Sequence, residues 1–335
     1  MSLVREVVDA FASVAPSRVL QREESLLLAP PLPSRMSRVR THAPIQVIHF
    51  ASQYVDQPFA RPRGVYESSA IRVEWQTMVG RQPFYHRNTA ADELSYQVCG
   101  ERTVLSELGS ADLAPGEFIL IPNGVAHDNY GRRDIHVLFY VPDALVPQLP
   151  PLRSAQADAA PFPGWQPQQI NEQVTEGLGG PEQDIVLFPV DEQLLLDHAR
   201  STPERMQILR PEDTASGTTW VYKSAHFLIG RTFLAASAGL EYRRHLDADE
   251  VQYQVSGERL LLTQRGMVPI EPGDFVRIPR GVAFTSIHAQ ASAHLTLVST
   301  HELPQVAETT RPATAVDMTA VDRLRAGVTH GSVPA

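Results

Sequence analysis

The sequence predicts an all-β protein made of two copies of one antiparallel β-sandwich or β-barrel. Two observations carry this prediction: a gapless internal repeat, and many short segments rich in β-branched and aromatic residues with turn-forming residues between them. Residues 88–127 align with residues 245–284 after a shift of 157 positions, and 19 of 40 residues are identical. A constant shift of this length indicates two copies of one structural unit.

Composition narrows the possible functions. The chain has 335 residues, 43% of them hydrophobic, and a net charge of −9, so we expect two domains with cores and no nucleic-acid binding. A single cysteine excludes an internal disulfide framework. No apolar run reaches the roughly 18 residues that span a membrane, and the N-terminus does not resemble a signal peptide. We therefore expect a cytoplasmic protein that does not contact membranes.

The N-terminal region, residues 1–43, is expected to form a short amphipathic helix followed by an extended, proline-containing arm at 28–34. The apolar residues at helical spacing are Val4, Val7, Val8 and Phe11. The first barrel is expected to span residues 44–145. Its predicted strands lie at 45–50, 71–79, 93–100, 102–109, 118–122 and 136–142.

A connector rich in proline, at residues 146–182, is predicted to be a linker. The second barrel is expected at 183–302, and a polar tail without strand patterning follows at 303–335. The predicted strands of the second barrel lie at 185–190, 206–211, 220–237, 250–257, 259–266, 275–279 and 293–300.

Two short motifs occur in both copies. In each, a glutamate is followed after six residues by a glycine, and a later stretch reads Gly-x5-Pro-x-Gly-x2 before one final residue. That final residue is His127 in the first copy and Phe284 in the second. These motifs resemble those of the cupin superfamily, and their duplication resembles a bicupin. The resemblance implies two tandem antiparallel β-barrels of the double-stranded β-helix, or jelly-roll, type. The motif residues are Glu93, Gly100, Gly116, Pro122, Gly124 and His127, and Glu250, Gly257, Gly273, Pro279, Gly281 and Phe284.

The resemblance implies a metal site in the first barrel, with His86, Glu93 and His127 as ligands and Asn88 at the second position of the superfamily's His-x-His pair. Two imidazoles and one carboxylate that leave open coordination positions suit non-haem Fe(II). Mn(II), Ni(II) or Zn(II) would accept the same ligands. The alternative is a metal-free barrel that keeps these residues as polar groups of its core.

The second copy is less complete. His245 and Glu250 remain, but Arg243 stands where the first histidine would be and an apolar ring replaces the motif-two histidine. We therefore expect a second barrel that is packed or holds only an organic ligand. A histidine of a neighbouring strand, His288 or His294, is the alternative third ligand.

Three further residues of the first barrel are candidates for catalysis because they are close in sequence to the ligands: Tyr96, Asn129 and His136. His136 is of most interest, since a neutral imidazole near a metal can act as a base. For each of them, core packing is the alternative role.

The stretches FYHRNTAADELSYQVCGERTVLSELGS (84–110) and AHDNYGRRDIHVLFY (126–140) resemble ring-cleaving dioxygenases of the homogentisate and hydroquinone type, especially large subunits of hydroquinone dioxygenases. This implies insertion of O2 into a small hydroquinone-, homogentisate- or gentisate-like substrate at Fe(II), without an organic cofactor. That group usually carries its iron in the C-terminal barrel, whereas the complete ligand set of this chain lies in the N-terminal one.

Two other classes of function stay open on the sequence alone: another metal-dependent cupin enzyme, such as an isomerase or oxidase, and a non-catalytic binding or assembly subunit. The ends of the chain contribute little to either barrel by their pattern. We expect them to pack on the other barrel or on another subunit, in a homodimer or in a complex with a smaller subunit.

Overall fold

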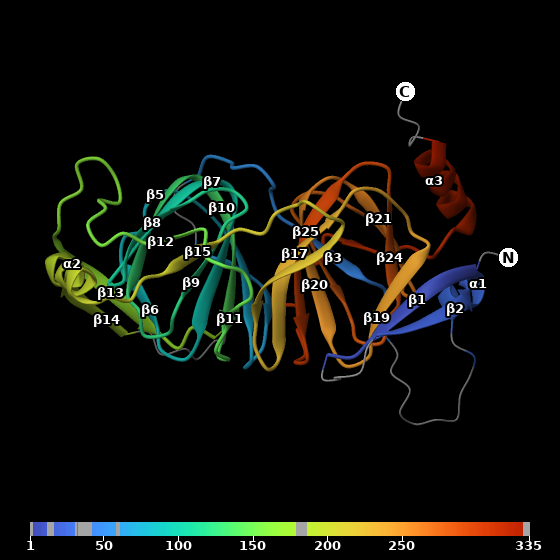
Figure 1. Cartoon of the computed structure of the whole chain (residues 1–335), viewed down its shortest axis with the longest axis horizontal. Helices are drawn as coiled ribbons and strands as arrows, with labels where there is room; N and C mark the ends of the chain where they lie inside the picture. The colour runs from blue at the N-terminus through green and yellow to red at the C-terminus, as the bar shows by residue number, and fades with distance from the viewer. Residues whose placement is uncertain are drawn as a thin grey trace.

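The computed structural model describes residues 3–11, 17–30, 32, 42–57, 61–178 and 186–330. Two β-barrels lie side by side along the long axis, the first in green and teal and the second in orange and red (Figure 1). Both consist mainly of antiparallel strand pairs, which confirms the predicted all-β bicupin architecture.

The first barrel is built around one sheet that has eleven strands among the described residues. Its long strands β7 (Asp92–Ser106) and β10 (His127–Val141) pair along most of their length. The other strands are β4 (Arg63–Glu67), β5 (Arg72–Arg81), β6 (Tyr85–Asn88), β8 (Gly109–Leu113), β9 (Phe118–Ile121), β12 (Arg153–Ser154), β13 (Gln169–Thr175), β14 (Val186–Asp191) and β15 (Gln207–Leu209).

The second barrel combines two sheets. One contains β3 (Gln46–His49), β11 (Val146–Pro147), β16 (Gly217–Lys223), β17 (Phe227–Leu234), β20 (Asp249–Ser256), β23 (Asp274–Ile278), β25 (Ser292–Ser299) and β26 (Arg311–Pro312). The other contains β1 (Leu3–Asp9), β2 (Arg18–Glu23), β18 (Ser237–Ala238), β19 (Glu241–His245), β21 (Arg259–Thr263), β22 (Gly266–Ile270) and β24 (Phe284–His288).

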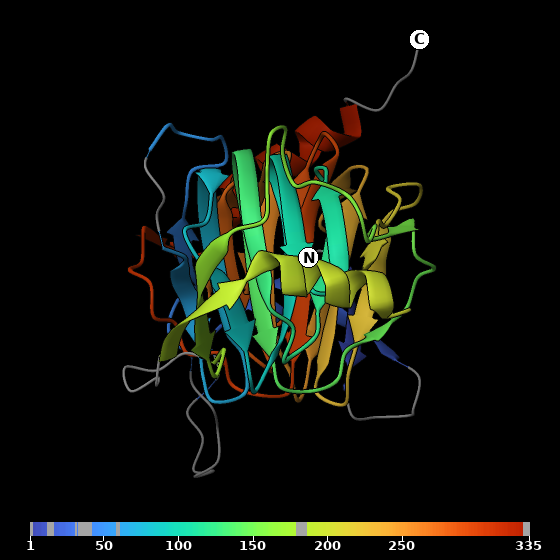
Figure 2. The same ribbon diagram turned by 90° about the vertical axis from the view of Figure 1, so that its left-hand side faces the viewer.

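Three helices lie outside the barrels. Helix α2 (Glu192–Ser201) crosses the outer end of the first barrel (Figure 2). Helices α1 (Glu24–Leu28) and α3 (Met318–His330) lie at the opposite end of the molecule, beside the second barrel (Figure 1). No helix in the described part of the chain has the length and apolar character needed to cross a bilayer.

The helix predicted near the N-terminus is wrong, because residues 3–9 form strand β1. This strand pairs parallel with β19 and antiparallel with β2, so it extends a sheet of the second barrel. Val4 is buried in that arrangement, whereas Leu3 is exposed. Over such a short segment the same apolar residues fit a strand as well as a helix, and pairing to an available sheet edge decides between them. Of the predicted arm at 28–34, Leu28 ends helix α1, residues 29, 30 and 32 are described without regular structure, and residues 31, 33 and 34 lie outside the described residues.

The chain also exchanges strands between the two barrels. Strand β3, from the segment expected to open the first barrel, pairs with β23 of the second. Conversely, β15 pairs with β9 of the first barrel, although its residues were expected in the second. The predicted linker supplies β12 and β13 to the first sheet, and the tail supplies β26 and α3 to the second barrel. Each barrel therefore contains segments that flank the other in sequence.

The largest apolar core lies between the barrels. In strand β7 alternate side chains point to opposite faces, so Leu94 and Tyr96 join this core while Glu93 points into the barrel. Trp75 of the first barrel stacks on Phe50, with ring centroids 5.0 Å apart, and Phe50 meets Phe275 edge-on. Each barrel thus has an apolar outer face that holds the two together and an inner face free to carry polar groups.

The backbone conformation explains why the first motif contains a glycine. Gly100 has φ 67°, and an added Cβ would lie 2.0 Å from the carbonyl oxygen of Arg133. Its repeat partner Gly257 has φ 72° and faces the carbonyl oxygen of Ala291 at 2.3 Å. Only glycine fits this close approach of two strands at a β-bulge.

Candidate metal centre

The three predicted ligands of the first barrel converge. His86 lies on β6, Glu93 on β7 and His127 on β10, and the two histidines are direct cross-strand neighbours. Their donor atoms all lie within 4.8 Å of one another. The Nε2 atom of His127 is 3.2 Å from Glu93 Oε2, and the Nδ1 atom of His86 is 3.8 Å from the same oxygen. The sequence prediction of this cluster therefore matches the geometry.

The second nitrogen of each imidazole is held by the protein. Nε2 of His86 is 3.0 Å from the hydroxyl of Thr175, which in turn donates to Asn88 Oδ1. The amide of Asn88 donates to Glu93 Oε2 at 3.1 Å, which closes the network. Nδ1 of His127 lies 3.3 Å from the carbonyl oxygen of Val125. Such outer contacts orient ligand rings and fix which nitrogen faces the metal.

Within the cluster, the charges of the two histidines act on the carboxylate of Glu93. Burial would raise the pKa of Glu93, but the charge of His127, the hydrogen bond from it and the charge of His86 lower that pKa to about 2. Burial opposes protonation of His127 too, yet Glu93 raises the pKa of this imidazole. Burial and the charge of His127 lower the pKa of His86 to about 4. A cation therefore meets one ionised carboxylate and one neutral imidazole at neutral pH.

This donor set fits a divalent transition metal. Two ligands bound at roughly 2.0–2.2 Å lie about 3–4 Å from each other, which is the spacing of these nitrogen and oxygen atoms. Glu93 and His127 are buried, while the side chain of His86 keeps 17% of its surface exposed. The cluster is therefore reachable from one side and shielded on the others.

His136 is placed by the structure inside the same barrel, but in a hydrogen-bonded pair rather than free. Its Nδ1 lies 2.7 Å from Asp134 Oδ2 and its Nε2 lies 3.1 Å from Gln76 Oε1. Burial lowers the pKa of its imidazole, with a contribution from the charge of Arg102. Both ring nitrogens are thus already engaged within the protein.

Asn129 and Tyr96 differ in their position. Asn129 follows His127 by two residues on β10 and therefore shares its inward face, where its Oδ1 is buried without a hydrogen-bond partner among the described residues. Tyr96 points the other way, into the core between the barrels, and its hydroxyl accepts a hydrogen bond from Arg231. The structure does not bring Tyr96 together with Glu93, because it lies three positions further along the same strand and therefore faces the opposite side.

Three residues of the site were missed by the sequence reasoning. Thr175 lies in the predicted linker, and no motif marks it. Arg102 is fully buried, donates to Ser95 Oγ and helps to lower the pKa of Glu93. The identity of Arg102 and Arg259 in the two copies was a usable signal. Glu74, on β5, is the third: burial raises the pKa of its carboxyl to about 7.

Among the described residues, the inside of the second barrel holds no comparable cluster; the other group of three possible metal ligands, His49, Glu271 and Asp274, has two exposed members. Glu250 instead pairs with His245, whose Nε2 is 2.9 Å away, and Arg243 lies opposite Phe284 in the strand register. Within the part of the chain that the structure describes, no group of three metal-binding side chains includes these residues. His288 and His294, the alternative third ligands, do not belong to any group of three metal-binding side chains among the described residues.

Comparisons with known proteins find similarity among solved structures alone. No protein-family model matches the sequence, and no curated protein does. Among solved structures, oxalate decarboxylase from Bacillus subtilis, which has Mn(II) centres, is 15% identical with a TM-score of 0.47 and 80% of each chain covered. A cupin 2 conserved barrel domain protein from Leptotrichia buccalis is 7% identical, with a TM-score of 0.45, 73% of this chain covered and 92% of that chain. AerE from Microcystis aeruginosa is 10% identical, with a TM-score of 0.40 and coverage of 74% and 99%.

Proposed function

We propose that the first barrel is the active site of a metal-dependent oxidoreductase that cleaves the ring of a hydroxylated aromatic compound with O2. The observation that carries this proposal is the convergence of His86, Glu93 and His127. Two imidazoles and one carboxylate are the ligands of non-haem Fe(II) oxygenases, and they leave positions open for other molecules. Mn(II), Ni(II) and Zn(II) share these preferences.

A bound Fe(II) would supply the Lewis acidity that lowers the pKa of a phenolic hydroxyl and would provide a position for O2. The residues of the chain prepare the site for it. Thr175 and Asn88 hold His86 and Glu93 in place, and Glu74 offers an interior carboxyl whose pKa, near 7, suits proton transfer at neutral pH. Asn129 presents an amide on the same face as His127.

The test combines metal analysis with oxygen uptake. Protein loaded anaerobically with Fe(II) should bind about one equivalent and consume O2 with hydroquinone, homogentisate or gentisate. His127→Ala should lose metal and activity together, whereas His245→Ala, the matched change in the second barrel, should keep the metal. Oxygen uptake that persists in metal-free His127→Ala would contradict the proposal. Metal loss in His245→Ala alone would place the active site in the C-terminal barrel.

We also propose that the chain forms a homodimer through the outer end of the first barrel. Strand β14 ends the order of the eleven-stranded sheet, and it carries exposed apolar side chains at Val186, Leu187 and Phe188. An unpaired sheet edge with exposed apolar residues favours pairing with a second edge. Sedimentation at micromolar concentration should show a dimer, and Leu187→Lys should shift it to monomer. A monomeric wild-type chain would refute this proposal and would leave a smaller partner subunit to be sought.

A further inference from the structure

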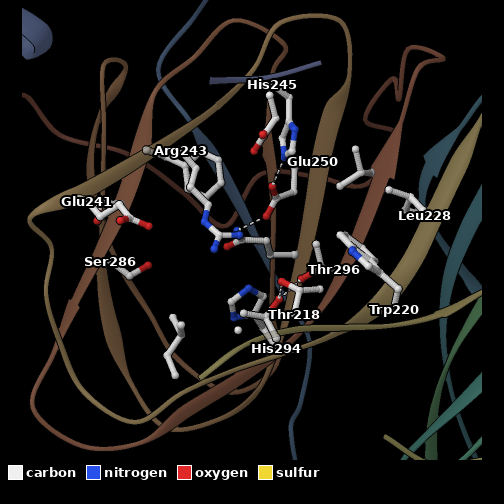
Figure 3. A pocket seen from close by; sticks show the side chains of 18 of the residues that line it. Thr218, Trp220, Leu228, Glu241, Arg243, His245, Glu250, Ser286, His294 and Thr296 are labelled. Carbon is white, nitrogen blue, oxygen red and sulfur yellow. Dashed lines mark hydrogen bonds and ion pairs between the residues drawn. The ribbon is translucent and has the colours of Figure 1, made fainter. Parts of the chain in front are cut away.

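The second barrel contains a cavity of about 530 Å³. Figure 3 shows its lining: His245 and Glu250 on one side, Arg243 and Ser286 on another, His294 and Thr296 below, and Trp220 and Leu228 opposite the arginine. The sequence left open whether this barrel would be packed or would hold an organic ligand. The structure shows the space for one, in the size range of small-molecule sites.

A buried cation lines this cavity. The Arg259 side chain is buried, and its guanidinium donates to Gln254 Oε1, Ser286 Oγ and Gln252 Oε1 at 2.6–2.8 Å. All three acceptors are neutral. A guanidinium has five N–H groups, so these bonds leave one on each terminal nitrogen. Burial of the charge lowers the pKa of Arg259 to about 10, although the charges of Glu250 and Asp274 act in the opposite direction.

The first barrel shows which group is missing. There, Gln97 donates to the carboxylate of Asp134, whose charge also favours the buried Arg102. In the second barrel the matching glutamine, Gln254, donates to Ser292 instead. The repeat has therefore lost an internal carboxylate beside a buried arginine that it kept.

The loss of this carboxylate also leaves one imidazole nitrogen without a hydrogen-bond partner among the described residues. By strand register His294 matches His136, since each faces the equivalent glutamine. Both ring nitrogens of His136 are hydrogen-bonded. His294 is equally buried, yet its Nδ1 has no hydrogen-bond partner among the described residues. Burial and the charges of Arg259, His288 and Arg243 keep the pKa of His294 well below its usual value, so this ring is neutral.

The carboxylates that already line the cavity are engaged elsewhere. Glu250 pairs with His245 and accepts a hydrogen bond from Gln252. Glu241 pairs with Arg5 at 3.2 Å. Asp9 also lies at the wall, where its charge helps to raise the pKa of His245. Among the described residues, none of these carboxylates makes a hydrogen bond to Arg259.

The opposite wall is apolar and includes an indole. Trp220 packs against Gly230, where an added Cβ would lie 3.0 Å from the ring carbon Cε3. Leu228 and Val298 continue this wall. Trp220 and Arg243 lie on opposite sides of the cavity (Figure 3). A planar apolar body can therefore lie against Trp220 while a charged end reaches Arg259, which also lines the cavity.

We propose that the second barrel is a metal-free binding site for a small aromatic carboxylate, whose carboxylate pairs with Arg259 and hydrogen-bonds with His294 while its ring packs on Trp220. Arginine binds carboxylates through two parallel hydrogen bonds, which the free N–H groups can provide. The ligand carboxylate takes over the role that Asp134 has in the first barrel. This site is additional to the metal centre and does not depend on it.

Calorimetric titration of the full-length chain tests the proposal, with benzoate as the probe and benzyl alcohol as its uncharged analogue. Benzoate should bind one site at least about tenfold more tightly than benzyl alcohol, with or without a metal chelator. Arg259→Gln should weaken benzoate binding by about tenfold or more. Arg200→Gln, which removes an arginine from the outer helix α2, should not change it.

Two further variants test the proposal in case Arg259→Gln does not fold. Thr296→Leu places in the cavity the residue that the first barrel carries at the matching position, Leu138, and should block benzoate while the protein stays folded. Arg243→Gln should weaken binding through the loss of positive charge. The proposal is overturned if benzoate does not bind at millimolar concentration, or if folded Thr296→Leu binds it as wild type does. Loss of binding in His127→Ala alone would also overturn it, since that result locates benzoate in the first barrel.

Discussion

The two barrels share a strand plan but use the same positions for different chemistry. Where the first places His86 opposite His127, the second places Arg243 opposite Phe284. Both keep the motif-one glutamate, and in both it is contacted from the position five residues earlier, by Asn88 in one and His245 in the other. Differences at three positions, His86/Arg243, Asn88/His245 and His127/Phe284, thus replace a three-ligand cluster by an ion pair, and the fold is unaffected.

The side chains that point into the two interiors differ in size as well. Leu138 and Tyr140 point into the first barrel, and the register places Thr296 and Val298 at the matching positions of the second. The two barrels also differ in which of two paired strands carries the glycine and which carries the large side chain. Gly64 faces Glu74 in the first barrel, whereas Trp220 faces Gly230 in the second. Smaller side chains at several positions leave the cavity of the second barrel. The two barrels therefore differ both in their candidate metal ligands and in the size of their interior side chains, and different residues account for the two differences.

The largest expected effect is the gain of a second metal. Arg243→His combined with Phe284→His restores the first barrel's histidine pair beside Glu250. Elemental analysis after Fe(II) loading should rise from about one to about two equivalents per chain, because two imidazoles and a carboxylate suffice for a metal site. The single change Arg243→His serves as the control and should not add an equivalent. If the double variant folds but binds no second ion, strand register alone does not explain the difference between the barrels.

Internal packing should produce the next largest effect. Leu138→Thr removes a buried apolar side chain from the interior of the first barrel and should lower the free energy of unfolding by about 2–4 kcal/mol. The reverse exchange, Thr296→Leu, places an apolar side chain beside an open cavity and should change it by less than about 1.5 kcal/mol. Denaturant unfolding measures both. Equal losses in the two variants would show that the interiors are packed alike.

Thr175 tests whether the connector strand supports the metal. Thr175→Val removes the hydroxyl that holds His86 while it preserves the shape of the side chain. Metal affinity should fall by about 10–100-fold, the effect typical of a residue that orients a ligand. Thr314→Val, at an exposed position beside the second barrel, is the matched control. Unchanged affinity in Thr175→Val would mean that packing alone orients His86.

The smallest effect concerns the ion pair that replaces the metal site. Burial would lower the pKa of His245, but the hydrogen bond and charge of Glu250 raise it above 6.5. Burial likewise opposes ionisation of Glu250, yet His245 lowers its pKa below 4.5. The stabilisation from the pair is therefore greatest between about pH 4.5 and 6.5. It decreases as pH rises through the raised pKa of His245 and as pH falls through the lowered pKa of Glu250.

His245→Gln should accordingly lose on the order of 1 kcal/mol more stability at pH 5.5 than at pH 8.5, relative to wild type. Unfolding curves at the two pH values measure this difference. His198→Gln, a substitution in helix α2 of the first barrel, provides the baseline. A difference that does not vary with pH would indicate that His245 is uncharged in the folded protein.

Much of this architecture was determined by the sequence itself. The repeat and the strand-and-turn pattern predicted two antiparallel barrels, and the resemblance to cupin motifs implied that His86, Glu93 and His127 form one cluster. The three side chains come together because β6 and β7 both pair with β10. Strong local periodicity over several strands also outweighs any single ambiguous segment.

Tertiary structure decided the remaining features. Residues 3–9 became a strand because a sheet edge of the second barrel was available to pair with them. Thr175 reached the metal cluster only because β13 aligns with β6, and the direction of Tyr96 followed from the pleat of β7. The cavity has the same origin. The size of the cavity depends on the summed volumes of side chains from several strands. This sum cannot be predicted from any one segment of the sequence, because only the strand register brings those residues together.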